Sequence, residues 1–292
     1  MVASHIAYSD ESYYGEERYR SISMVSVERS SDQILSKSIR QLLVESEVSE
    51  FKWNKLRQAR ERFAAFKMID KCIEFAIENK LRIDTLIWDT HDSRHQVPGR
   101  DDIANLQRMY YHLFKNVLHN RWAADITWIL FPDENSALDW ETVQDFLDSS
   151  GWVLHENVSL FDKDPFHTRL SKDFNIENIN EISSEEKPIC QVSDLFAGIG
   201  AFSHTAYDKY NRWLKSESGQ LPLGLFKQKK ISLSNSEKER FTVIKYLDDK
   251  CKDCNFRVSL KTAKGFKTFD PKYPINFWLY EPQHPEDKAP TN

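Results

Sequence analysis

The stretch His5 to Asp10, which reads HIAYSD, indicates how the fold begins. Its apolar and small residues alternate, and a polar loop with Gly15 follows, which is typical of a strand and a turn. The stretch Tyr19 to Val27 shows a similar, less regular alternation and lies close enough along the chain to pair with the first strand. The sequence therefore predicts an opening β-hairpin, with the acidic pair Asp10 and Glu11 at the end of its first strand.

After the hairpin, segments with helical periodicity alternate with short apolar runs. Helices are predicted over Ile34 to Val44, Arg57 to Asn79, Ile103 to Arg121, Asp139 to Leu147 and Ile189 to Tyr207. Strands are predicted over Leu81 to Trp88, Ala124 to Phe131, Trp152 to Leu160 and Ile179 to Ile182, the first as a buried parallel strand. This alternation indicates β-α-β crossovers, so we expect an α/β fold with a mixed sheet and helices on both faces.

The last part of the chain differs in character from the rest. From about Ser216 it is rich in lysine, with a charged helix predicted over Ser236 to Lys250 and aromatic extended sequence over Ile275 to Tyr280. We therefore expect a first domain over residues 1–215 and a C-terminal accessory region over residues 216–292. The accessory region is a candidate surface for a protein partner or for a second copy of the chain.

Composition narrows the classes of function. The chain has 292 residues, 40% of them hydrophobic, and lacks an apolar run of the roughly 20 residues that span a membrane, so we expect a cytoplasmic protein. Cys251 and Cys254 have the spacing of half a zinc site, but no second pair follows, so zinc is not expected. The net charge of -5 argues against binding nucleic acid by overall charge and leaves local patches or bound cations.

Three predicted strands end in an acid, namely Asp10, Asp89 and Asp133. Ligands of open α/β sheets collect at the carboxyl ends of the strands, so these side chains are predicted to meet in one crevice. Carboxylate oxygens are the ligands that Mg²⁺ and Mn²⁺ prefer. The alternative for each residue alone is that Asp ends a strand because it favours turns.

A fourth acid, Asp194, lies in the predicted helix over Ile189 to Tyr207. The residues three, four and seven positions later are Ala197, Gly198 and Ala201, so the helix surface beside the acid is small. Such a surface allows close approach to a sheet, whereas a solvent-facing helix would more often carry Lys or Glu there. We therefore expect Asp194 to point into the same site.

Four motifs carry a resemblance to a known family: YSDES at residues 8–12, EFKW at 50–53, LFPDE at 130–134 and QVSDLFAG at 191–198. In this order and spacing, the sequence resembles domain-of-unknown-function family 3800 from about residue 5 to residue 205. The resemblance implies an RNase H-like fold and a nuclease that uses Mg²⁺ or Mn²⁺, sometimes in the setting of phage defence or mobile elements. Two departures are Tyr13, where the family usually has Gly, and Ser193, where Ala is commoner.

The resemblance also implies roles for single residues. Asp10, Asp133 and Asp194 match the family's metal-binding acids, and Glu11 matches an assisting acid. Glu50 and Lys52 match a charged motif in which Lys52 would stabilise developing phosphate charge. Asp89 is kept as a further metal ligand, ranked below Asp133.

Several other side chains are weaker candidates. Glu134 follows Asp133, and His91 lies in the loop after Asp89, where it could donate a proton or bind a metal, but such loop residues are more often only solvated. Lys227, Lys229 and Lys230 are candidate contacts to the phosphates of DNA or RNA, although charge runs usually form solvated faces. The sequence therefore favours a metal-dependent nuclease, and its rival is a non-catalytic RNase H-like protein that binds nucleic acid or a protein partner.

Overall fold

The computed structural model describes residues 3–12, 18–92, 102–123, 125–134, 140, 175–217 and 232–281. The strand predicted over Trp152 to Leu160 lies outside these ranges. So does the helix predicted over Asp139 to Leu147, apart from Trp140. Within the described ranges, none of the helices is long and apolar enough to cross a lipid bilayer.

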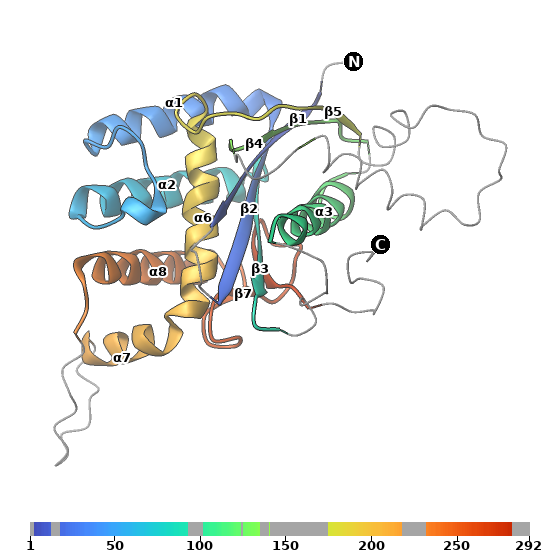
Figure 1. Cartoon of the computed structure of the whole chain (residues 1–292). Helices are drawn as coiled ribbons and strands as arrows, with labels where there is room; N and C mark the ends of the chain where they lie inside the picture. Colours follow the sequence, from blue (N-terminus) through green and yellow to red (C-terminus); the bar gives the residue numbers. More distant parts are fainter. Residues whose placement is uncertain are drawn as a thin grey trace, which may run out of the picture.

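A six-stranded mixed sheet forms the centre of the molecule (Figure 1). Its strand order is β5-β4-β1-β2-β3-β8. The strands are β1 (His5–Ser12), β2 (Tyr19–Glu28), β3 (Leu81–Asp89), β4 (Trp128–Pro132), β5 (Ile176–Ile179) and β8 (Ile275–Leu279). The first three pair antiparallel, β4 runs parallel to β1, and β5 runs parallel to β4. A three-stranded meander followed by two parallel strands beside β1 is an RNase H-like arrangement, as expected.

The opening hairpin is confirmed, because all eight residues of β1 pair with β2. Its two strands are buried almost throughout, which explains the imperfect alternation in the second strand. The prediction for β3 needs a correction. This strand runs antiparallel to β2 and is parallel only to β8, since it continues the meander instead of returning through a crossover helix.

Helices cover both faces of the sheet, as Figure 1 shows. They are α1 (Arg29–Glu45), α2 (Ala59–Ile77), α3 (Asp102–Asn120), α6 (Pro188–Thr205), α7 (Tyr207–Glu217) and α8 (Asn235–Asp253), with a short 3-10 helix at Trp53–Lys55. A capping box starts α8, in which Ser234 and Glu237 satisfy each other's backbone N–H groups. The charged helix predicted over Ser236 to Lys250 is found here as α8.

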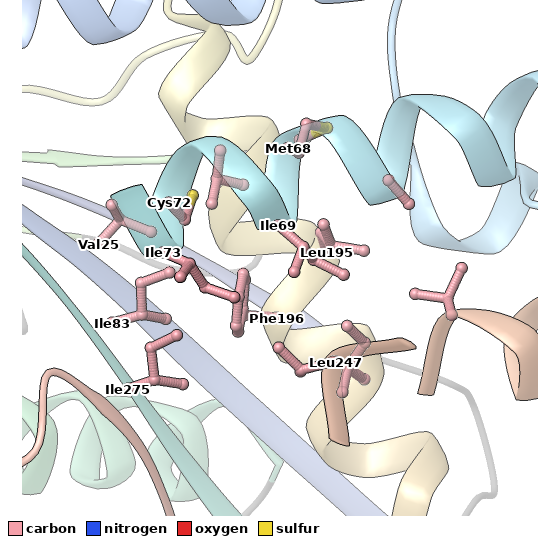
Figure 2. Packing of buried hydrophobic residues seen from close by; sticks show 14 of the residues in the cluster. Val25, Met68, Ile69, Cys72, Ile73, Ile83, Leu195, Phe196, Leu247 and Ile275 are labelled. Carbon is pink, nitrogen blue, oxygen red and sulfur yellow. The ribbon is translucent and has the colours of Figure 1, made fainter. Parts of the chain in front are cut away.

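Two hydrophobic cores lie on opposite faces of the sheet. The larger one contains side chains from α1, α2, α6 and α8, and Figure 2 shows Ile69 and Ile73 of α2 beside Leu195 and Phe196 of α6. The smaller one packs α3 against the other face, through residues that include Tyr110. Helix α6 therefore lies in the middle of the larger core, directly over β1 and β2.

The C-terminal residues belong to the same core as the rest. Strand β8 extends the sheet beside β3, and Phe241 and Leu247 of α8 are buried in the larger core. The fully buried Asp84 of β3 accepts a hydrogen bond from Asn276 of β8 at 3.0 Å. The boundary expected near residue 216 is thus not a boundary between cores, because the region after it supplies a sheet edge and a core helix. Two short strands, β6 (Val258–Ser259) and β7 (Lys267–Thr268), join α8 to β8.

Candidate active site

Asp10 and Glu11 lie near the carboxyl end of β1, on opposite faces of the sheet. Successive side chains of a strand alternate, so Asp10 shares the face of Tyr8 in the larger core, and Glu11 shares the face of Ala7 in the smaller one. Asp10 is 6% exposed, and its Oδ1 accepts the backbone N–H of Glu11 at 2.7 Å. Glu11 accepts the Tyr110 hydroxyl of α3 at 2.6 Å. Of the two acids, Asp10 therefore faces α6 and Glu11 is held by α3.

Asp133 follows β4 and lies beside the end of β1. Pro132 is in register with Ser9, and the Asp133 N–H donates to the Ser9 carbonyl at 2.8 Å. Neighbouring strands are separated by about 4.8 Å, so this register brings Asp133 to the level of Asp10. The convergence predicted from parallel strand ends is found for this pair.

Asp194 approaches the same region from helix α6. The Ser193 hydroxyl donates to the Tyr8 carbonyl at 3.0 Å, which fixes the helix over β1. One carboxylate oxygen of Asp194 accepts the backbone N–H of Trp53 at 2.6 Å. The small residues predicted beside Asp194 allow two close contacts. The Ala197 carbonyl accepts a hydrogen bond from the Ser21 hydroxyl of the sheet, and Gly198 packs against Trp53.

Lys52 places a positive charge among these acids. Its Nζ lies 3.4 Å from Asp133 Oδ2 and 3.7 Å from Glu50 Oε1. Glu50 in turn accepts the Ser184 hydroxyl at 2.9 Å and pairs with Lys55 at 3.3 Å. The EFKW motif at residues 50–53 thus brings one ammonium group to the carboxylates.

Burial and mutual repulsion raise the pKa values of the clustered acids. Burial raises the pKa of Asp10 well above its ordinary value, and the charges of Asp194, Glu11 and Asp133 raise it further. Burial also raises the pKa of Glu11 to about 7 and that of Asp194 to about 6, although Lys52 opposes both shifts. Burial lowers the pKa of Lys52, but the surrounding carboxylates outweigh this effect and raise it. The four acids therefore act as one repulsive cluster that a cation would relieve.

The chemistry of this cluster fits a hard divalent cation, since every candidate ligand is a carboxylate oxygen. Asp10 and Asp194 each use one oxygen to accept a backbone N–H, and each carboxylate has a second oxygen. However, nowhere in the described part of the chain do three acidic, His or Cys side chains lie close enough together to hold a metal ion as they stand. The donor set therefore suits Mg²⁺ or Mn²⁺ in chemistry, but the side chains are not arranged as a ready coordination shell.

Other predicted site residues lie elsewhere. Asp89 is in register with Tyr19, whereas Asp10 aligns through Ser23 with Thr85, so Asp89 lies four residues further along the sheet. It pairs with Arg18 at 2.6 Å and accepts the backbone N–H of the exposed His91. Asp89 and His91 therefore do not belong to the candidate site, contrary to the prediction.

Glu134 is exposed, and its backbone N–H donates to Ile182. Lys227, Lys229 and Lys230 lie outside the described residues. Glu134 therefore adds no group to the carboxylate cluster, and the phosphate contacts of the three lysines stay a prediction.

Sequence reasoning missed two residues that hold the cluster in place. Tyr110 supports Glu11 from α3, and no local pattern in that helix marks it. Gln191 accepts the Phe51 N–H at 2.8 Å and donates to the Ser184 carbonyl at 2.9 Å. Gln191 lies three residues before Asp194 in the QVSDLFAG motif, so the one-turn spacing was a signal that could have identified it.

The fold and the site together define an α/β protein of the RNase H-like class with a buried carboxylate cluster at the end of its first strand. No family model matches the chain. It is 40% identical to "Uncharacterized protein ORF2'" of Methanothermobacter thermautotrophicus, over 97% of this chain and 96% of that protein. It is 39% identical to "Uncharacterized protein ORF2" of the same organism, with the same coverage. The chain belongs to the family of these two proteins.

Among solved structures, ribonuclease H2 from Pyrococcus horikoshii OT3 is similar, with a TM-score of 0.38 and 10% sequence identity. The similarity covers 85% of this chain and 99% of that chain.

Proposed function

We propose that the chain is a nuclease that hydrolyses phosphodiester bonds of DNA or RNA with Mg²⁺ or Mn²⁺. The observation that carries this proposal is that Asp10, Asp133 and Asp194 lie close enough at the end of β1 for their charges to act on one another and on Lys52. These three acids come from a strand, the end of a second strand and a helix that are far apart in sequence. The preference of Asp for turns explains Asp10 or Asp133 alone, but it does not explain why both share one region with the helical Asp194 and a lysine.

In this proposal Asp10, Asp133 and Asp194 would hold the cation. A bound divalent ion activates water and stabilises the attacking and leaving oxygens of a phosphodiester. The cation is also required electrostatically, because an acidic cluster repels a phosphate backbone until positive charge reverses its local sign. The motif resemblance to domain-of-unknown-function family 3800 agrees with these assignments.

The remaining groups have supporting parts. Lys52 would place its ammonium group beside the phosphate and stabilise the charge that develops there. Glu11, held by Tyr110 on the other face of the sheet, orients the end of β1 instead of sharing the face of Asp10. Glu50 pairs with both Lys52 and Lys55 and so limits the positions of the Lys52 ammonium group.

A second candidate is a non-catalytic protein that binds nucleic acid through the same fold. One observation favours it, namely that the described carboxylates do not form a ready coordination shell. Metal titration separates the two candidates. The nuclease proposal predicts that Mn²⁺ raises the melting temperature of the wild type and supports cutting of labelled single- or double-stranded DNA or RNA. Binding of these nucleic acids with neither effect would support the second candidate.

A further inference from the structure

The segment 50–56, here called the Lys52 segment, is fastened to α6 on one side. Gln191 accepts the N–H of Phe51, and Asp194 accepts the N–H of Trp53. Both bonds are made by side chains one helical turn apart on α6. The backbone on each side of Lys52 is therefore tied to the helix that carries Asp194.

Helix α8 holds the same segment from another side. The Arg240 guanidinium donates to the carbonyl oxygens of Trp53 at 3.2 Å and Asn54 at 3.5 Å. The Ser236 hydroxyl, one turn earlier on α8, donates to the Leu56 carbonyl at 2.8 Å. These contacts join residues more than 175 positions apart in the chain, so the C-terminal helix fixes the segment that carries Lys52.

Trp53 connects the two helices. A Cβ atom at Gly198 of α6 would lie 2.1 Å from the Cγ atom of Trp53, so the helix leaves room for the indole only because residue 198 is glycine. The Arg240 guanidinium lies over the Trp53 ring at 5.4 Å and over the Phe202 ring at 5.2 Å. A cation over an aromatic face is attractive, most of all for Trp. The indole is thus fixed between α6 and α8.

The direction of the Lys52 side chain follows from these anchors. Lys52 has extended backbone angles, with φ at -136° and ψ at 129°. In extended backbone, successive side chains point to opposite sides, so the fully buried Phe51 and Trp53 leave Lys52 to point away from both. Its ammonium group then lies beside Asp133 and Glu50. A shift of Trp53 would move Lys52 relative to the carboxylates.

We propose that Arg240 is a positioning residue for Lys52, and that through it α8 controls how the ammonium group meets the carboxylate cluster. The role of Lys52 in turnover rests on the proposed nuclease function, whereas the mechanical link between Arg240 and the Lys52 segment does not. Arg240 acts through the backbone of Trp53 and Asn54 and touches no reacting group.

The test compares Arg240→Met with a matched control. Methionine keeps an unbranched side chain over the two rings but removes the donors to Trp53 and Asn54. The control is Arg62→Met, because Arg62 also lies over an aromatic ring and pairs with Glu239, the neighbour of Arg240 on α8, at 2.7 Å. Both variants weaken contacts with α8, but only Arg240→Met releases the Lys52 segment.

The first measurement is amide hydrogen exchange, which needs no activity. We expect Arg240→Met to speed exchange of the Trp53 and Phe51 amides by about five-fold relative to Arg62→Met, since a backbone held by fewer bonds opens more often. Unchanged exchange at these two amides would overturn the proposal. Equal acceleration in both variants would also overturn it, by showing only general loosening of α8.

The second measurement uses cleavage in the presence of Mn²⁺. We expect Arg240→Met to lower kcat on the order of ten-fold with little change in KM, because misplacement of a catalytic group by about 1 Å can slow a reaction a hundred-fold. In a Lys52→Met background the same change should alter kcat less than about two-fold. Equal losses in both backgrounds would contradict a role through Lys52. If the wild type cuts nothing, the proposed function fails, and hydrogen exchange alone decides the positioning role.

Discussion

The Lys52 Nζ atom lies 3.4 Å from Asp133 Oδ2, which joins residues 81 positions apart in sequence at the end of the first strand. This contact places beside the acid that follows β4 an ammonium group that lowers the pKa of each of the four clustered acids. Lys52 thus supplies one positive charge to several carboxylates. The cluster therefore keeps an excess of negative charge, and the predictions below depend on that excess.

Neutralising Asp194 should stabilise the protein near pH 7.5. Burial raises the pKa of Asp194 to about 6, so the folded state binds more protons than the unfolded state between about pH 4 and pH 6. Wild-type stability from this group therefore falls as pH rises through that window and stays low above it. Asp194→Asn keeps an oxygen for the Trp53 N–H and should raise the free energy of unfolding by on the order of 1 to 2 kcal/mol. Urea denaturation at pH 5 and pH 7.5 checks this, and a gain equal at both pH values would contradict it.

Divalent cations should stabilise the wild type more than they stabilise Asp10→Asn. Mn²⁺ binds the folded state and so raises the melting temperature as its concentration increases, and EDTA reverses the effect. Asp10→Asn should lose most of this increase, because the charges of Asp194, Glu11 and Asp133 all act on Asp10. Asp89→Asn is the control, since that acid also ends a strand but pairs with Arg18. Equal responses of the two variants would place the cation elsewhere.

Gly198→Ala should displace Trp53 and destabilise the fold. The added Cβ would meet the indole at 2.1 to 2.6 Å, which the packed ring cannot accept without moving. Overpacking of this kind costs about 1 to 3 kcal/mol. Gly200→Ala is a useful comparison, because its Cβ meets Thr85 and Ile87 of the sheet instead. Hydrogen exchange should show faster opening at Trp53 only in Gly198→Ala; the same effect from both changes would mean that Gly198 has no special link to the Lys52 segment.

Asp84→Ala should loosen the docking of the C-terminal strand. Asp84 is fully buried, pairs with Arg121 and lies 3.6 Å from Arg82. Removal of one partner from a buried charge group costs about 3 to 5 kcal/mol, because the remaining charges lose their compensation. Urea denaturation followed by circular dichroism should show one cooperative transition, shifted to lower urea. A separate early transition for residues 232–281 would instead support an independent accessory region.

The sequence predicted the central part of the site because its geometry follows from local rules. Asp10 lies near the end of β1 and Asp133 follows β4, and because these neighbouring strands are parallel, their carboxyl ends lie at the same edge of the sheet. Asp194 was marked by the small residues that follow it in its helix. Asp89 obeyed the same strand-end pattern, yet it lies four residues beyond the level of Asp10, because register depends on pairing between strands and is not written in either strand alone.

The role of the C-terminal region could not be predicted from the sequence, because its contacts join residues far apart in the chain. Ile275 pairs with Ile83 across 192 positions, and Arg240 reaches Trp53 across 187 positions. A Lys-rich, aromatic stretch looks like a separate appendage when only its composition is considered. Tyr110 is similar, because a tyrosine in an amphipathic helix gives no sign that its hydroxyl will meet Glu11.

The most direct test of the central claim is cleavage of labelled single- and double-stranded DNA and RNA by the wild type, Asp10→Asn and Asp89→Asn, with Mn²⁺ and with EDTA. The account predicts cleavage by the wild type only with the cation, a loss of at least about a hundred-fold in Asp10→Asn, and nearly full activity in Asp89→Asn. Cleavage in EDTA, cleavage that survives Asp10→Asn, or no cleavage of any of these nucleic acids by the wild type would contradict it.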